Sequence, residues 1–226
     1  MDDESLRCLC TINNESNCLE CEIHGKLNCK YNKKLARYFL WNQMPSFIIG
    51  FFGLALTSVL IGHWWFFISY PVIIILNFGV LETKFLCSHC PYYADDGRIL
   101  HCLALDGFPK FWKYNPKPMS KFDKGMMTLI VILLVGIPFS GELYGLYYLF
   151  INNYEILTLL GMLGVFIATA LTSWQFFYII DKQYCVFCVN FSCPLNKVPK
   201  SIIDQYLRKN PIMKEAWEKS GYQLGE

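Results

Sequence analysis

The residues of this chain that are best suited to chemistry are its eleven cysteines, which fall into short, regularly spaced groups. Two of these groups are Cys87-x-x-Cys90 and Cys185-x-x-Cys188, and the second is followed closely by Cys193. Thiols separated by two residues are typical of metal ligands and of redox-active pairs, because one turn of chain brings both sulfurs to one place. Each pair comes directly after a long apolar stretch of sequence, so that stretch must position it.

The apolar stretches predict a membrane protein. Of the 226 residues, 54% are hydrophobic, whereas about 45–50% is usual for a soluble domain. The excess lies in two blocks, Phe39–Leu86 and Met126–Ile180. As a single helix the first block would be about 70 Å long, more than twice the bilayer core of about 30 Å. We therefore expect each block to fold back once, at Gly62-His63 and at Asn152-Asn153. The expected crossings are near 40–61, 64–85, 126–150 and 156–180.

The predicted fold class is an all-α membrane protein with four transmembrane helices in two hairpins. A Cys-rich, metal-stabilised cytoplasmic cap and short C-terminal amphipathic helices complete it. The sequence Asn210-Pro211 predicts the start of one of these short helices, and Gly221 its end. The expected segments are a Cys-rich N-terminal segment, a first hairpin, a Cys/His loop, a second hairpin, and a Cys motif with a helical tail (1–38, 39–86, 87–125, 126–180 and 181–226).

Lysine and arginine flank the cysteine-bearing ends of the expected crossings, and the two short connections around His63 and Asn152 carry none. Basic residues favour the cytoplasmic side. We therefore expect an integral protein of a prokaryotic inner (plasma) membrane with both termini in the cytoplasm. All eleven cysteines then lie in a compartment where disulfides rarely persist, which favours metal binding or redox chemistry.

The two hairpins are expected to bring one set of candidate metal ligands to a single face of the membrane. These are Cys87, Cys90, His101, Cys102, Cys185, Cys188 and Cys193. Zinc and cubane iron–sulfur clusters both require four ligands. The simplest arrangement is one or two centres built jointly by the two loops, and the metal identity stays open between zinc and an iron–sulfur cluster.

A second candidate metal site lies in the N-terminal segment, which has too little apolar content to form a core alone. Cys8, Cys10, Cys18 and Cys21 form two close pairs that predict a tetrahedral zinc site. His24 and Cys29 could together replace the first pair, Cys8 and Cys10.

One carboxylate, Glu142, lies inside an apolar stretch, where an ionisable residue suggests function. Counting along the third crossing places Glu142 in the non-cytoplasmic half, near the level of His63. The two form a candidate pair for proton transfer, or for a quinone site. The alternative is that Glu142 belongs to the outer interface with Tyr144, Tyr147 and Tyr148.

Two resemblances bear on the chemistry. Cys193-Pro194 is similar to the end of bacterial ferredoxin-type runs, although the full Cys-x2-Cys-x2-Cys-x3-Cys run is absent and no residue role follows. The arrangement of four membrane helices with cytoplasmic Cys-Pro motifs resembles membrane-bound ferredoxin-type quinol dehydrogenases. A CxxC pair at the end of a fourth helix also resembles the vitamin K epoxide reductase arrangement, which would imply thiol–disulfide exchange.

These observations predict a membrane metal–thiolate protein, most simply a redox subunit that links cytoplasmic metal centres to a membrane carrier such as a quinone. Two alternatives stay open: a zinc-braced scaffold that docks a cytoplasmic partner, and a membrane thiol–disulfide oxidoreductase. Aromatic and basic residues alternate from Phe108 to Lys117 beside a membrane helix, which indicates an interfacial collar rather than nucleic-acid binding. The expected partners are the lipid bilayer and a protein within a larger complex.

Overall fold

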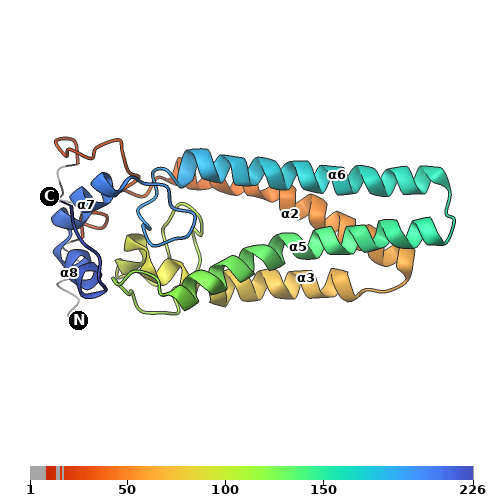
Figure 1. The fold of residues 1–226 in the computed structure, drawn as a ribbon, viewed down its shortest axis with the longest axis horizontal. Helices are drawn as coiled ribbons and strands as arrows, with labels where there is room; N and C mark the ends of the chain where they lie inside the picture. Colours follow the sequence, from red (N-terminus) through yellow and green to blue (C-terminus); the bar gives the residue numbers. More distant parts are fainter. Residues whose placement is uncertain (1–8, 14–15, 17, 226) are drawn as a thin grey trace.

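The computed structural model describes residues 9–13, 16 and 18–225, and the regular elements among them are helices, with one isolated β-bridge between Ile99 and Pro109. Four long helical segments run side by side and make up most of the molecule (Figure 1). Each is long and apolar enough to cross a bilayer: Lys33–Ile61, Trp65–His89, Lys121–Ile151 and Ile156–Tyr184. Four such segments were predicted from the two apolar blocks, and they extend several residues beyond the expected crossings at the cysteine-bearing end.

The helices form two consecutive hairpins. In the first, α2 (Lys33–Ile61) ends at Gly62, whose φ of 79° allows the tight reversal into α3 (Trp65–Leu76). In the second, α5 (Lys121–Ile151) and α6 (Ile156–Ile179) are joined by residues 152–155. The start of α5 is fixed by a capping box, because Ser120 and Asp123 each accept the other's backbone N–H.

The tightest helix packing lies between α2 and α5, and glycines make it possible. A Cβ placed on Gly53 of α2 would stand 2.0, 2.7 and 2.9 Å from three atoms of the Glu142 side chain. A Cβ on Gly145 of α5 would stand 2.8 Å from the Thr57 hydroxyl. Gly161 and Gly164 of α6 make no such contact, because among the described residues nothing lies within 4 Å of a Cβ at either position.

The outer surface of the bundle is apolar. Large hydrophobic side chains such as Trp41, Phe150 and Leu157 are exposed there, whereas the interior holds polar residues including Gln43, Asn77 and Glu142. An apolar exterior of this kind suits contact with lipid, in which helices associate through small residues and buried polar groups rather than through a hydrophobic core.

At one end, the bundle carries a cap with its own hydrophobic core. It is assembled from the N-terminal segment, the two thiol loops, α7 (Lys200–Lys209) and α8 (Pro211–Lys219). The start of α8 at Pro211 confirms the helix start predicted from Asn210-Pro211. Phe191 from the second loop contacts the rings of Tyr206 in α7 and Trp217 in α8, with ring centroids 5.1 and 6.3 Å apart. The amphipathic tail is thus part of the cap.

Candidate functional site: two thiol groups and an apolar cavity

Ten cysteines are described, and all of them lie at the end of the bundle that also carries both chain termini (Figure 1). They fall into two sets. The bundle-end thiol group contains Cys87, Cys90, Cys102, Cys185, Cys188 and Cys193. The N-terminal thiol group contains Cys10, Cys18, Cys21 and Cys29. None of the ten forms a disulfide, and Cys8 lies outside the described residues.

The bundle-end thiols are positioned by a repeated local structure. In each hairpin the second helix widens into one π-helical turn before its CxxC pair: η1 (Asn77–Leu81) after α3, and η4 (Ile180–Tyr184) after α6. A short α4 (Glu82–Phe85) separates η1 from Cys87, whereas Cys185 follows η4 directly. Turns of this type are rare and are often found at functional sites.

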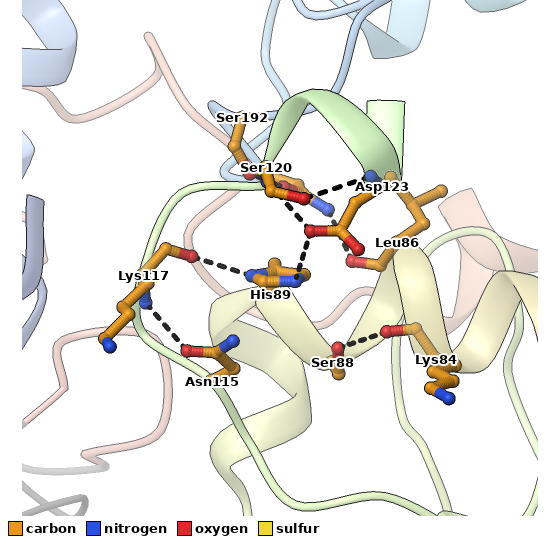
Figure 2. A network of polar contacts seen from close by, with 10 residues as sticks. Lys84, Leu86, Ser88, His89, Asn115, Lys117, Ser120, Asp123 and Ser192 are labelled. Carbon is orange, nitrogen blue, oxygen red and sulfur yellow. Dashed lines mark hydrogen bonds and ion pairs between the residues drawn. The ribbon is translucent and has the colours of Figure 1, made fainter. Parts of the chain in front are cut away.

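Asparagine and histidine side chains fasten the thiol loops to the bundle. Asn190 donates to the carbonyl of Leu86 at 3.0 Å, which ties the second loop to the residue preceding Cys87. His89 Nδ1 lies 2.7 Å from the Lys117 carbonyl and its Nε2 lies 3.8 Å from Asp123 at the start of α5. Figure 2 shows His89 between these two partners. The carbonyl can only accept, so Nδ1 carries the proton.

Four sulfurs of the bundle-end group accept backbone N–H groups from residues two or three positions further along the chain. The best defined is the amide of Leu105, 3.1 Å from the Cys102 sulfur. Amide donors of this kind stabilise a thiolate, and they tune the potential when the thiolate holds a metal. The four sulfurs and their donors are Cys90 with Tyr92, Cys102 with Ala104 and Leu105, Cys188 with Asn190, and Cys193 with Leu195 and Asn196.

Burial has the opposite effect to those amides, because it raises the pKa of the thiols whereas the amides lower it. It raises the pKa of Cys188 and of Cys102 to about 11, and that of Cys193 to about 12. Neighbouring thiols add to the effect, since Cys188 raises the pKa of both Cys90 and Cys193. At neutral pH these thiols therefore keep their protons unless a metal ion displaces them.

The N-terminal thiols are also neighbours. Burial, together with the charges of Cys18, Cys21 and Cys10, raises the pKa of Cys29 to about 12. Ser16 connects two members, because its hydroxyl donates to the Cys10 carbonyl at 3.2 Å and lies 3.5 Å from the Cys18 sulfur. Cys29 is therefore a neighbour of Cys10, Cys18 and Cys21, the three described members of the predicted zinc site that also included Cys8.

The cap holds the N-terminal group in place through the C-terminal helices. The buried Asn210 between α7 and α8 accepts the backbone N–H of Cys10 at 2.7 Å, and Lys30 Nζ donates to the Cys10 carbonyl at 2.7 Å. Tyr92 lies between the two thiol groups. Its hydroxyl donates to the Asn28 carbonyl at 2.5 Å, and burial together with the charges of Cys90, Cys188 and Cys29 raises its pKa.

The predicted histidine ligands stand apart from the sulfurs. His101 is exposed. Its Nδ1 lies 3.2 Å from Asp106 Oδ1, and its ring contacts that of Tyr31. His24 is exposed as well. Within the described part of the chain, no three His, Cys, Asp or Glu side chains are arranged to hold a metal ion. Metal binding by the thiols is therefore still a prediction.

Glu142 and His63, the predicted proton-transfer pair, occupy different levels of the bundle. Glu142 is 0% exposed, packs against Gly53, and accepts a hydrogen bond from Thr169 at 2.8 Å. His63 is exposed in the turn after α2. The nine residues from Gly53 to Gly62 correspond to about 14 Å along a helix, so Glu142 lies deeper than the sequence had suggested and is not at the outer interface.

An apolar cavity of about 220 Å³ lies inside the bundle against the thiols. Cys185, Cys188 and Cys193 form part of its wall, and Thr169, the partner of Glu142, lines it as well. So does Glu82 of α4, whose carboxylate has no hydrogen-bond or ion-pair partner among the described residues. The cavity thus brings three thiols and a carboxylate to one apolar space.

Sequence reasoning missed Glu82, Asn190 and His89. Glu82 could have been noticed as an acidic residue within the last turns of an apolar crossing, as Glu142 was. Asn190 and His89 lie within or beside the CxxC motifs, but their role depends on contacts between distant segments, which no local pattern encodes. Comparisons of the chain with family models, with curated proteins and with solved structures give no match.

Proposed function

We propose that this chain is an integral membrane metal–thiolate protein, a redox subunit that transfers electrons between thiolate-held metal centres and a membrane carrier. The observation that carries the proposal is the position of the apolar cavity directly against Cys185, Cys188 and Cys193. A lipid-soluble carrier in that space would be close to the centre that exchanges electrons with it. A zinc-braced scaffold has no need of such a space beside its ligands.

The thiols suit metal binding for two physical reasons. Backbone amides point at the sulfurs of Cys90, Cys102, Cys188 and Cys193, and such donors support thiolate ligands. Four thiolates are the usual ligand set of an iron–sulfur cluster and of structural zinc. Thiol–disulfide exchange is less well supported, because it requires a readily ionised thiol, and burial raises the pKa of Cys185 to about 12.

The proposed orientation places the cap in the cytoplasm. Lys33, Lys34 and Arg37 begin α2, Lys121 and Lys124 begin α5, and the connections at 62–64 and 152–155 contain no lysine or arginine. This distribution follows the positive-inside rule. The cap would then be available to a cytoplasmic partner, as expected for a subunit of a larger complex.

The proposal is tested by a reductive titration of the protein purified without oxygen in detergent. Visible absorption should bleach on adding dithionite and return on reoxidation. The Cys188→Ser variant should lose most of this change, and Ser192→Ala, a neighbouring substitution outside the thiols, should retain it. A spectrum that does not respond to reductant would overturn the redox function and leave the scaffold alternative.

A further inference from the structure

The cavity at the thiols has a feature that its size alone does not explain, which is a set of polar groups in otherwise apolar walls. Besides Glu82, the lining includes Gln43, Tyr70 and Ser173. Placing an unpartnered carboxylate inside a membrane bundle is costly, and such residues usually serve a ligand or a proton. The Glu82 carboxylate therefore marks a place where a polar atom of a ligand fits.

A second recess of about 280 Å³ shares part of its wall with the cavity. The two spaces share Phe177, Ile180, Cys185 and Leu195 as lining residues. The outer recess also contains Trp174 and Tyr178, which are 72% and 56% exposed on α6. It therefore opens where the bundle is expected to contact lipid, and it adjoins the inner cavity at the thiols.

We infer that the two spaces together form a binding site for a lipid-soluble carrier of the quinone class, with its ring in the inner cavity and its tail in the outer recess. A cavity of about 150 Å³ already accepts benzene, so the inner space can take one substituted six-membered ring. Glu82 hydrogen-bonds a ring oxygen, as donor when protonated and as acceptor when ionised. This inference rests on the proposed redox function, because only a redox carrier needs to approach Cys185, Cys188 and Cys193.

Other occupants fit less well. The acyl chain of a lipid would fill the apolar volume but would leave Glu82 and Gln43 without partners. A water-soluble substrate has no use for the outer recess, whose Trp174 and Tyr178 face the expected lipid. A molecule with a polar flat ring and an apolar tail satisfies both parts of the site.

The test is photolabelling of the detergent-purified protein with an azido-benzoquinone that carries a ten-carbon tail, followed by peptide mapping. Labelled peptides should include residues from the end of α6 and the 185–195 loop. Leu134 lines the cavity, so the larger side chain in Leu134→Trp should fill part of it and lower labelling at least about tenfold. Leu133→Trp is the matched control, because Leu133 is its exposed neighbour and does not line the cavity. It should label like the native chain.

A second pair of variants keeps the test valid even if Leu134→Trp misfolds. Glu82→Leu should weaken binding of the benzoquinone about tenfold or more, the usual effect of removing one charged hydrogen bond. Glu82→Gln should retain most of the binding, since an amide can also serve a ring oxygen. Unlabelled decanol, which has the tail without the ring, should compete poorly.

Each outcome has a defined meaning. Labelling that is insensitive to Leu134→Trp and to Glu82→Leu, or that decanol removes as well as the unlabelled quinone, would overturn the site. Specific labelling of a protein without redox-active metal would support the site and contradict the proposed electron transfer. Redox-active metal in a protein that shows no specific labelling would contradict only the carrier site.

Discussion

At the scale of single residues, the six bundle-end thiols are not equivalent. Cys90, Cys102, Cys188 and Cys193 each accept a backbone amide, and the Leu105 nitrogen lies 3.1 Å from the Cys102 sulfur. An amide that points at a sulfur stabilises its thiolate and therefore a metal bound to it. These four cysteines are the best candidates for the ligands of one centre.

We therefore expect Cys188→Ser to lower metal affinity at the bundle end by at least about tenfold, because a hydroxyl replaces a thiolate ligand. Metal content per chain, measured after dialysis against a weak chelator, checks this. Ser192→Ala removes a hydroxyl that donates to the Asn190 side chain at 3.2 Å and, among the described residues, to no other group, and it should leave the metal content unchanged. Equal metal content in Cys188→Ser and the native chain would exclude Cys188 as a ligand.

At the scale of helices, the α2–α5 contact depends on Gly53, whose missing side chain leaves room for Glu142. Gly53→Ala introduces a methyl group that overlaps three atoms of that carboxylate side chain. Overpacking of this kind typically costs about 1–3 kcal/mol. A lower thermal unfolding midpoint in detergent is the expected result.

Gly161→Ala is the matched control, because a Cβ there meets nothing within 4 Å among the described residues. It should be neutral or slightly stabilising, since alanine has the higher helix propensity. Equal midpoints for the two variants would contradict the close α2–α5 packing.

The last helices of the cap depend on Asp204 of α7. Its carboxylate accepts hydrogen bonds from Lys200 Nζ, the Tyr222 hydroxyl and the Gly225 N–H at 2.8, 2.8 and 3.0 Å. Burial alone would raise the pKa of Asp204, but these donors outweigh it and lower the pKa below its usual value. A carboxyl with a lowered folded-state pKa stabilises the fold above its ordinary pKa of about 3.9, and this contribution is lost as pH falls through the lower value.

Residues 220–225 should therefore detach from α7 in acid. Asp204→Asn should release them already at neutral pH, at a cost of about 2 kcal/mol for the lost charged hydrogen bonds. Trp217 reports the change, because its ring centroid lies 5.1 Å from that of Tyr222. A Trp217 fluorescence signal that is the same for the native chain and for Asp204→Asn at pH 7 would contradict this account.

At the scale of the whole molecule, both termini and all described thiols lie at one end of the bundle, and the turns at 62–64 and 152–155 lie at the other (Figure 1). In intact cells a membrane-impermeant maleimide should label His63→Cys and Glu155→Cys, and it should reach terminal tags carrying cysteine only after permeabilisation. Labelling of terminal tags in intact cells would reverse the proposed orientation.

The sequence predicts the architecture well and the site only in part. Length and hydrophobicity determine the four helices, and Ser120, Asp123, Asn210 and Pro211 mark two helix starts through local chemistry. The thiols were identified by spacing alone. Glu82 and Asn190 were missed, because their roles depend on which segments meet at the bundle end. For the same reason Glu142 was placed too near the surface, since its depth depends on how α5 packs against Gly53.

The most direct test of the central claim is the metal and acid-labile sulfide content of the protein, purified without oxygen in detergent. The account predicts iron and sulfide in at least stoichiometric amount, together with broad visible absorption. Stoichiometric zinc without sulfide would contradict electron transfer and indicate a zinc-braced membrane scaffold. Protein without bound metal would contradict the metal–thiolate account as a whole.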